Sequence, residues 1–86
     1  MAIRRGISKT LSSAEHKAFC ALMIETREAA GLTQVQLAKK LRKSQSFIAK
    51  YEGGERRIDV IEFLIITRAI GADPVSLLRT LVQRTS

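Results

Sequence analysis

The sequence is poor in residues that bind metals or form covalent cross-links. It has one cysteine, Cys20, and one histidine, His16, among its 86 residues. A single cysteine excludes an intramolecular disulfide, and one cysteine with one histidine falls short of the ligands of a structural zinc site. We therefore expect no metal and no cofactor. Cys20 is predicted to be a small apolar residue on or beside the buried face of a helix.

The chain also lacks the patterns that direct a protein into or across a membrane. No apolar run reaches transmembrane length, and the opening residues MAIRRGISKTLSS do not resemble a signal peptide. No strand alternation bounded by hairpin turns is visible, and the single proline and the few glycines fall between helical segments. These features favour one small all-α domain, and we expect a cytoplasmic protein of a bacterium or its phage.

Residue sets that support catalysis are absent from the sequence. It contains no paired catalytic carboxylates, no Ser/His/Asp set and no glycine-rich phosphate loop. His16 falls in the first turn of a predicted helix with no ligand partner nearby, which is typical of a surface residue. We therefore predict that the protein is not an enzyme, and no small-molecule ligand is evident.

Positive charge, by contrast, is in excess and unevenly distributed. The formal net charge is +7. Residues 1–10 carry three basic groups and no acid, residues 39–57 carry a net charge of +5, and residues 58–86 are neutral overall. A clustered positive field attracts a phosphate backbone, so a nucleic acid is the expected partner.

Residues that cap helix N-termini divide the chain into helices. Serine, threonine and aspartate side chains accept hydrogen bonds from the free N–H groups of a first helical turn. Five of them precede segments with helical periodicity: Ser12, Thr33, Ser44, Asp59 and Asp73. Glutamate or glutamine three residues later completes a capping box after the first, second and fourth, and Pro74 suits a first helical position. We predict a compact five-helix bundle over residues 12–86, with the first helix over 12–30, preceded by a flexible basic arm over 1–11.

Apolar residues recur on one face of each predicted helix, as expected for elements that share a core. Gly31, the pair Gly53-Gly54, and Gly71 lie where the first, third and fourth helices should end. The predicted inward residues are Phe19, Leu22, Met23, Thr26 and Ala30, then Leu37, Ala38 and Leu41, then Ile48 and Tyr51, and then some of Val60, Phe63, Leu64, Ile66, Ala69 and Ile70. The apolar side of the last helix consists of Val75, Leu78, Leu81 and Val82.

Residues 31–52, GLTQVQLAKKLRKSQSFIAKYE, form the most informative stretch of the chain. They predict two short helices joined by a tight turn, which is the helix-turn-helix pattern, and the second helix of that motif enters the DNA major groove. The second helix begins with small polar residues suited to base edges. Gln45 can donate to and accept from one base edge and matches adenine N6 and N7, while Ser46 can contact several bases. Ala49 could meet a thymine methyl group, and Lys50 could reach guanine or phosphate.

The ordered motifs across residues 19–78 resemble the phage lambda repressor/Cro family of DNA-binding domains. The similarity lies in Arg27 four residues before Gly31, then Gly31-Leu32-Thr33-Gln34, Leu37-Ala38, Ser44-Gln45-Ser46, Ile48, Glu52, Gly54, Arg56 and Ala69-Ile70-Gly71. Two positions depart from the family pattern, because Ile58 stands where proline is common and Thr67 where alanine is common. Asp59 still supplies a cap for the next helix.

The resemblance implies roles for several side chains. In that family, the glutamine that opens the first helix of the motif touches phosphate and braces the glutamine that opens the second, and these positions are Gln34 and Gln45. It also implies a partly buried ion pair between Arg27 and Glu52. Basic and polar residues beside the motif are predicted to contact the DNA backbone: Lys43, Ser44, Arg56 and Arg57.

The sequence therefore predicts a sequence-specific regulator that binds double-stranded DNA, namely a repressor of phage, prophage or mobile-element type that occupies an operator. Two alternatives remain open: the antitoxin of a toxin–antitoxin pair with the same DNA-binding domain, and a co-activator module that bridges proteins. Apolar residues of the last helix exceed what one edge helix needs to bury. A symmetric homodimer through Val75, Leu78, Leu81 and Val82 is therefore expected.

Overall fold

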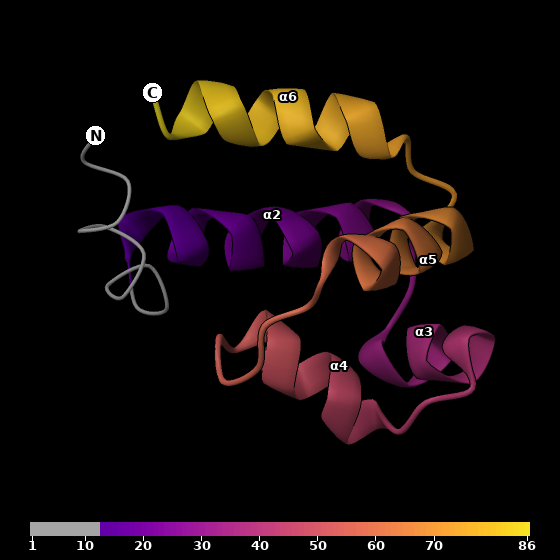
Figure 1. Cartoon of the computed structure of the whole chain (residues 1–86). Helices are drawn as coiled ribbons and strands as arrows, with labels where there is room; N and C mark the ends of the chain where they lie inside the picture. The colour runs from indigo at the N-terminus through magenta and orange to yellow at the C-terminus, as the bar shows by residue number, and fades with distance from the viewer. Residues whose placement is uncertain (1–12) are drawn as a thin grey trace.

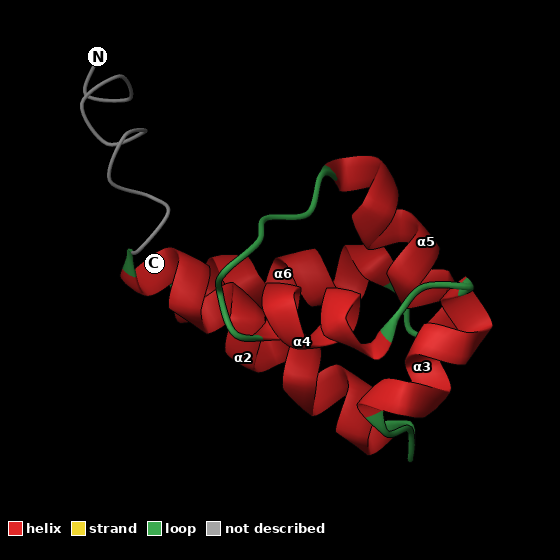
Figure 2. Ribbon diagram, turned by 90° about the horizontal axis from the view of Figure 1, so that it is seen from below, coloured by secondary structure: helices red, strands yellow, loops and turns green. Residues whose placement is uncertain are grey.

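A computed structural model describes residues 13–86, and this part of the chain consists of helices and loops without a strand (Figures 1 and 2). The helices are α2 (Ala14–Ala29), α3 (Gln34–Leu41), α4 (Gln45–Glu52), α5 (Val60–Ile70) and α6 (Pro74–Arg84). The predicted all-α five-helix fold is confirmed. The predicted basic arm over 1–11 lies outside the described residues.

Local caps start each helix, as the sequence predicts, with one correction. Ser13, not Ser12, caps α2, and its hydroxyl oxygen accepts from the His16 N–H at 3.1 Å. The serine adjacent to the helix is the one whose oxygen meets the third N–H of the first turn. The other predicted caps, Thr33, Ser44, Asp59 and Asp73, are confirmed, and the boxes of Thr33 with Gln36 and Asp59 with Glu62 are complete.

The end of α2 sets the direction of the chain into the helix-turn-helix. Gly31 follows the C-cap with φ of 76°, a left-handed conformation that costs glycine little because it has no Cβ. The Leu32 N–H then donates to the Arg27 carbonyl, and the Gly31 N–H donates to that of Glu28. This Schellman pattern reverses the chain within two residues, which brings α3 back towards the end of α2.

The core lies where α2, α3, α4 and α5 meet. Its buried residues are Met23, Leu37, Ala38, Ile48, Tyr51, Phe63 and Ile66. The predicted inward faces of these helices are confirmed except at Ala30, which is exposed because it is the C-cap that precedes the turn. Of the candidates named for α5, Val60 is 71% exposed at the start of the helix, and the others are buried or half-buried.

Helix α6 packs antiparallel to α2, on the side of α2 away from α3 and α4 (Figure 1). An ion pair between Arg84 and Glu25, 2.8 Å between nitrogen and oxygen, joins these two helices. Only Leu77 of α6 packs against the central cluster. As a result, much of the apolar face of α6 remains exposed.

Candidate nucleic-acid interface

A tight turn orients α4 relative to α3. Arg42 ends α3 in the left-handed conformation, with φ of 55° and ψ of 42°, and it is the non-glycine residue with positive φ in the described chain. The Lys43 N–H donates to the Ala38 carbonyl at 3.0 Å, and Ser44 then caps α4 by accepting from the Phe47 N–H at 3.2 Å. The two short helices pack against each other directly, so the turn presents the N-terminus of α4 at the surface.

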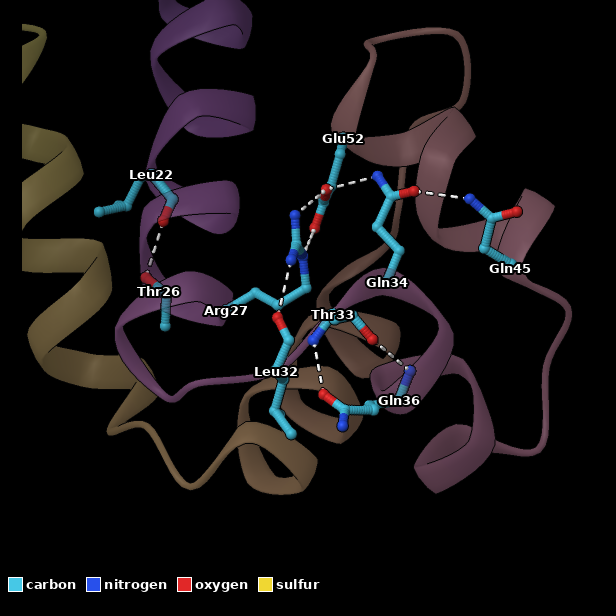
Figure 3. Close-up of polar contacts among 9 residues, drawn as sticks. All are labelled: Leu22, Thr26, Arg27, Leu32, Thr33, Gln34, Gln36, Gln45 and Glu52. Atoms are coloured by element: carbon cyan, nitrogen blue, oxygen red, sulfur yellow. Dashed lines mark hydrogen bonds and ion pairs between the residues drawn. The ribbon is translucent and has the colours of Figure 1, made fainter.

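The other end of α4 is anchored by a buried ion pair. Arg27 donates from Nε to Glu52 Oε2 at 2.8 Å and from Nη2 to Oε1 at 3.1 Å (Figure 3). Both residues are buried, at 8% and 5% exposure. Arg27 also donates from Nη1 to the Leu32 carbonyl, and the hydrogen bond to Glu52 raises the pKa of its guanidinium. The pair therefore connects α2, the loop before α3 and the end of α4.

Two glutamine amides continue this network to the surface. Gln34 Nε2 donates to Glu52 Oε1 at 2.9 Å, and Gln45 Nε2 donates to Gln34 Oε1 at 2.7 Å (Figure 3). Gln34 is partly buried, whereas Gln45 is exposed at the first position of α4. The exposed amide of Gln45 is thus held by a continuous chain of hydrogen bonds that begins at Arg27.

The outer face of α4 carries the other residues predicted to contact bases. Ser46 and Lys50, one turn apart, are exposed, and Ala49 is half-buried. Ile48 and Tyr51 occupy the opposite face and are almost completely buried. The prediction that Tyr51 points into the core is confirmed, and burial raises the pKa of its hydroxyl.

A basic cluster lies beside α4 around the half-buried Phe47. Lys43 Nζ is 5.5 Å from the centre of the Phe47 ring, and the Arg56 guanidinium is 4.8 Å from it. Both distances are within the range of cation–π attraction. Arg57 is exposed next to Arg56, which donates to its carbonyl oxygen. Positive charge is therefore gathered at one edge of the α4 face.

The acidic residue Glu62 contacts this basic cluster, although the sequence alone did not assign Glu62 to the interface. Arg56 Nη2 donates to Glu62 Oε2 at 2.9 Å, which lowers the pKa of that carboxyl, and the Asp59 N–H lowers it further. In the sequence, Glu62 is evident only as the capping-box partner of Asp59. Its contact with Arg56 depends on how the loop between α4 and α5 folds back.

Cys20 is buried, its thiol donates to the Tyr51 carbonyl at 3.4 Å, and burial raises its pKa. Across residues 13–86, no group of three or more histidine, cysteine, aspartate or glutamate side chains could hold a metal ion. No helix in that range is long and apolar enough to cross a membrane.

A family model described as Helix-turn-helix (HTH_3) matches residues 23–77, which is more than half of the chain. The chain belongs to this family, the phage lambda repressor/Cro-like helix-turn-helix group of DNA-binding transcription regulators. Proteins of this family are typically non-enzymatic.

Solved structures give the same fold. An XRE-family like protein from Pseudomonas syringae pv. tomato str. DC3000 is 46% identical, with a TM-score of 0.82 over 94% of this chain and 99% of that one. The restriction-modification controller protein C.Esp1396I, a tetramer in complex with its natural 35 base-pair operator, is 19% identical, with a TM-score of 0.74 over 84% and 95% of the two chains. The clp gene regulator ClgR from C. glutamicum is 20% identical, with a TM-score of 0.76 over 87% and 97%. No curated protein matches the sequence.

Proposed function

We propose that this protein is a transcriptional repressor of phage, prophage or mobile-element type that acts in the bacterial cytoplasm by occupying a double-stranded DNA operator. The observation that carries the proposal is the exposed Gln45 amide, held by Gln34 at the first position of α4. A surface glutamine that only faced water would need no such support. The family supplies the general activity, and the similar controller protein was solved on its operator.

In this proposal α4 enters the major groove with its N-terminus first. Gln45 contacts adenine through N6 and N7, Ser46 and Lys50 contact neighbouring base edges, and Ala49 faces a thymine methyl group. Ser46 and Lys50 share an exposed face with Gln45, which supports this assignment. Ala49 is half-buried, so its share of the contact is the smallest.

Contacts to the DNA backbone are proposed for residues at or near the ends of α3 and α4. Ser44 caps α4 through its oxygen, and its hydroxyl proton remains available to a phosphate. Lys43 and Arg57 are exposed beside it. Gln34 retains a second N–H for a phosphate, and Arg56 reaches one by exchanging or sharing its bond with Glu62. Such contacts orient a protein on the duplex without specifying its sequence.

The operator is proposed to be palindromic and bound by a homodimer. Val75, Leu78 and Val82 lie on one face of α6 and are 60%, 47% and 65% exposed, while Leu81 is half-buried. Leu78 and Val60 also line a mostly apolar groove of about 180 Å³. One reading helix covers only a few base pairs, and helix-turn-helix proteins extend their sites through two-fold dimers with half-sites one helical turn apart. A second copy of this chain is therefore the proposed occupant of the α6 face.

Selection of bound sites from random duplex DNA tests the proposal. We expect an inverted repeat whose half-sites each contain an adenine that the Gln45→Ala variant no longer prefers. A single unrepeated half-site would contradict the dimer. If the protein bound no duplex at low salt and instead captured a protein partner, a bridging role would replace the repressor.

A further inference from the structure

We infer that Glu52 is a positioning residue for sequence recognition, because it determines through Gln34 which way round the Gln45 amide is presented to a base. The inference rests on the proposed function and assigns to the buried ion pair a role beyond stability. Glu52 contacts no DNA in this scheme. It acts through two intervening amides.

An ionised carboxylate accepts hydrogen bonds but does not donate them. Glu52 accepts from two nitrogens of Arg27 and from Gln34 Nε2. Gln34 can satisfy Glu52 only with its NH₂ group, so its amide has a single orientation. Its carbonyl oxygen therefore points the other way, towards Gln45.

Gln45 is then constrained in turn. Since Gln34 offers an oxygen, Gln45 must use one N–H to donate to it, at 2.7 Å. One N–H and the carbonyl oxygen of Gln45 remain for a base. That donor and acceptor match N7 and the N6 amino group of adenine. With the opposite orientation, the Gln34 NH₂ group would donate to the Gln45 oxygen. The two N–H groups of Gln45 would then face the base, and two donors match guanine N7 and O6.

Burial makes this constraint effective. Glu52 is 5% exposed and is held by Arg27 on both of its oxygens, so water does not replace its partners and the carboxylate does not turn away. A neutral amide at position 52 could donate as well as accept. Gln34 would then be free to take either orientation, and the preference for adenine over guanine would be lost.

The experiment compares two variants that both break the ion pair. Glu52→Gln removes the acceptor that orients Gln34, whereas Arg27→Gln leaves Glu52 to accept from Gln34. Affinity is measured for two duplexes that differ at one base pair, adenine or guanine, at the position assigned by Gln45→Ala. Because the fraction of folded protein affects both duplexes equally, the ratio of the two affinities is independent of stability.

We expect a wild-type adenine-to-guanine ratio of about tenfold or more, falling to within about threefold for Glu52→Gln and staying near the wild-type value for Arg27→Gln. Equal ratios for wild type and Glu52→Gln, or equal losses in both variants, would overturn the inference while leaving the proposed function intact. A wild-type protein that bound no duplex would overturn both.

Gln34→Lys provides a second test that leaves the buried pair in place and does not depend on the folding of Glu52→Gln. A lysine ammonium group only donates, so it can bond to Glu52 but must offer N–H groups to Gln45. We expect the Gln45 amide to turn and the preference to move from adenine towards guanine. An adenine preference equal to that of wild type would overturn the inference.

Discussion

Glu52 is the last residue of α4, and its carboxylate accepts hydrogen bonds from three nitrogens, two of Arg27 on α2 and one of Gln34 on α3. Each donor belongs to a residue far from it in the sequence, so the carboxylate joins three elements at one point. Burial strengthens these contacts, and it also makes their loss costly, because a buried charge without a partner is strongly destabilising. Stability and the geometry of the α4 face therefore depend on the same residue.

Replacing Glu52 should therefore destabilise the fold. Glu52→Gln leaves the Arg27 charge without its counterion in a buried position, and breaking such a pair costs about 3–5 kcal/mol. A denaturant melt measures the free energy of unfolding. Glu55→Gln, at an exposed neighbouring position, is the matched control and should change stability by less than about 0.5 kcal/mol. A loss below about 0.5 kcal/mol in Glu52→Gln would mean that water screens the pair.

The two glutamines should contribute to DNA affinity as a unit. Gln45→Ala is expected to cost about 1–3 kcal/mol on the preferred site and to relax preference at one base position. Gln34→Ala should cause part of the same loss, because it removes the acceptor that holds Gln45. In a double-mutant cycle on the selected operator, the combined loss should be smaller than the sum of the single losses. Strictly additive losses would show that Gln34 does not brace Gln45.

At the scale of elements, the turn between α3 and α4 contains an unfavourable backbone conformation. Arg42 adopts positive φ, where the Cβ of a non-glycine residue lies too close to backbone atoms. Glycine would be the usual residue at such a helix end. The neighbouring helix-turn-helix geometry depends on this reversal, so the rest of the fold must hold Arg42 in place.

Arg42→Gly should accordingly stabilise the protein. Left-handed backbone costs a non-glycine residue roughly 1–2 kcal/mol, and the extra entropy of glycine in the unfolded chain offsets part of the gain, which leaves about 0.5–1 kcal/mol. Arg42→Ala is the control, since it removes the same charge but keeps Cβ. Denaturant melts should place Arg42→Gly above both Arg42→Ala and wild type. Equal stabilities of the two variants would show that the turn is not strained.

For the whole molecule, charge and exposed apolar surface lie in different places. The net charge of +5 over residues 39–57 surrounds α4, whereas residues 58–86 are neutral overall. Figure 1 shows α6 on the side of α2 away from α3 and α4. The proposed DNA contacts and the proposed dimer contacts therefore involve different helices.

The salt dependence of DNA affinity should measure how many phosphates the basic residues around α4 contact. The logarithm of affinity should fall with the logarithm of salt concentration by about 0.9 per phosphate neutralised. Lys43→Ala should reduce that slope by about one unit. Arg56→Ala should reduce it by less, because Glu62 already pairs with Arg56 in the free protein. Arg79→Ala on α6 is the control and should leave the slope unchanged. A slope that no variant alters would exclude these phosphate contacts.

The exposed apolar face of α6 should determine whether the protein forms a dimer. Leu78→Asp places a charge in the exposed face of α6 without entering the core, since Leu78 is 47% exposed. We expect it to shift the protein from dimer to monomer in sedimentation and to weaken binding to a palindromic operator. Gln83→Asp, also exposed on α6, introduces the same charge and should leave the dimer intact. Leu81→Asp should reduce dimerisation too, but Leu81 is half-buried, so its effect combines assembly with stability. If wild type and Leu78→Asp were both monomers with equal affinity for one half-site, the homodimer would be wrong.

Local chemistry allowed much of the fold to be predicted from the sequence. A cap acts across three residues, so Thr33, Ser44, Asp59 and Asp73 mark the starts of four helices whatever their surroundings. Among the predicted caps the one error, Ser12 for Ser13, is a shift of a single residue between adjacent serines. Apolar periodicity likewise indicated the core faces, because helical geometry places every third or fourth residue on one side.

Other contacts of the candidate interface were decided only by the tertiary structure. Arg56 pairs with Glu62 and lies over the Phe47 ring because the loop after α4 folds back, and no local pattern specifies that path. The bond from Gln34 to Glu52 also requires the packing of α3 against α4. Sequence periodicity shows which face of a helix is apolar. How much of that face is covered, as on α6, depends on where the neighbouring helices lie.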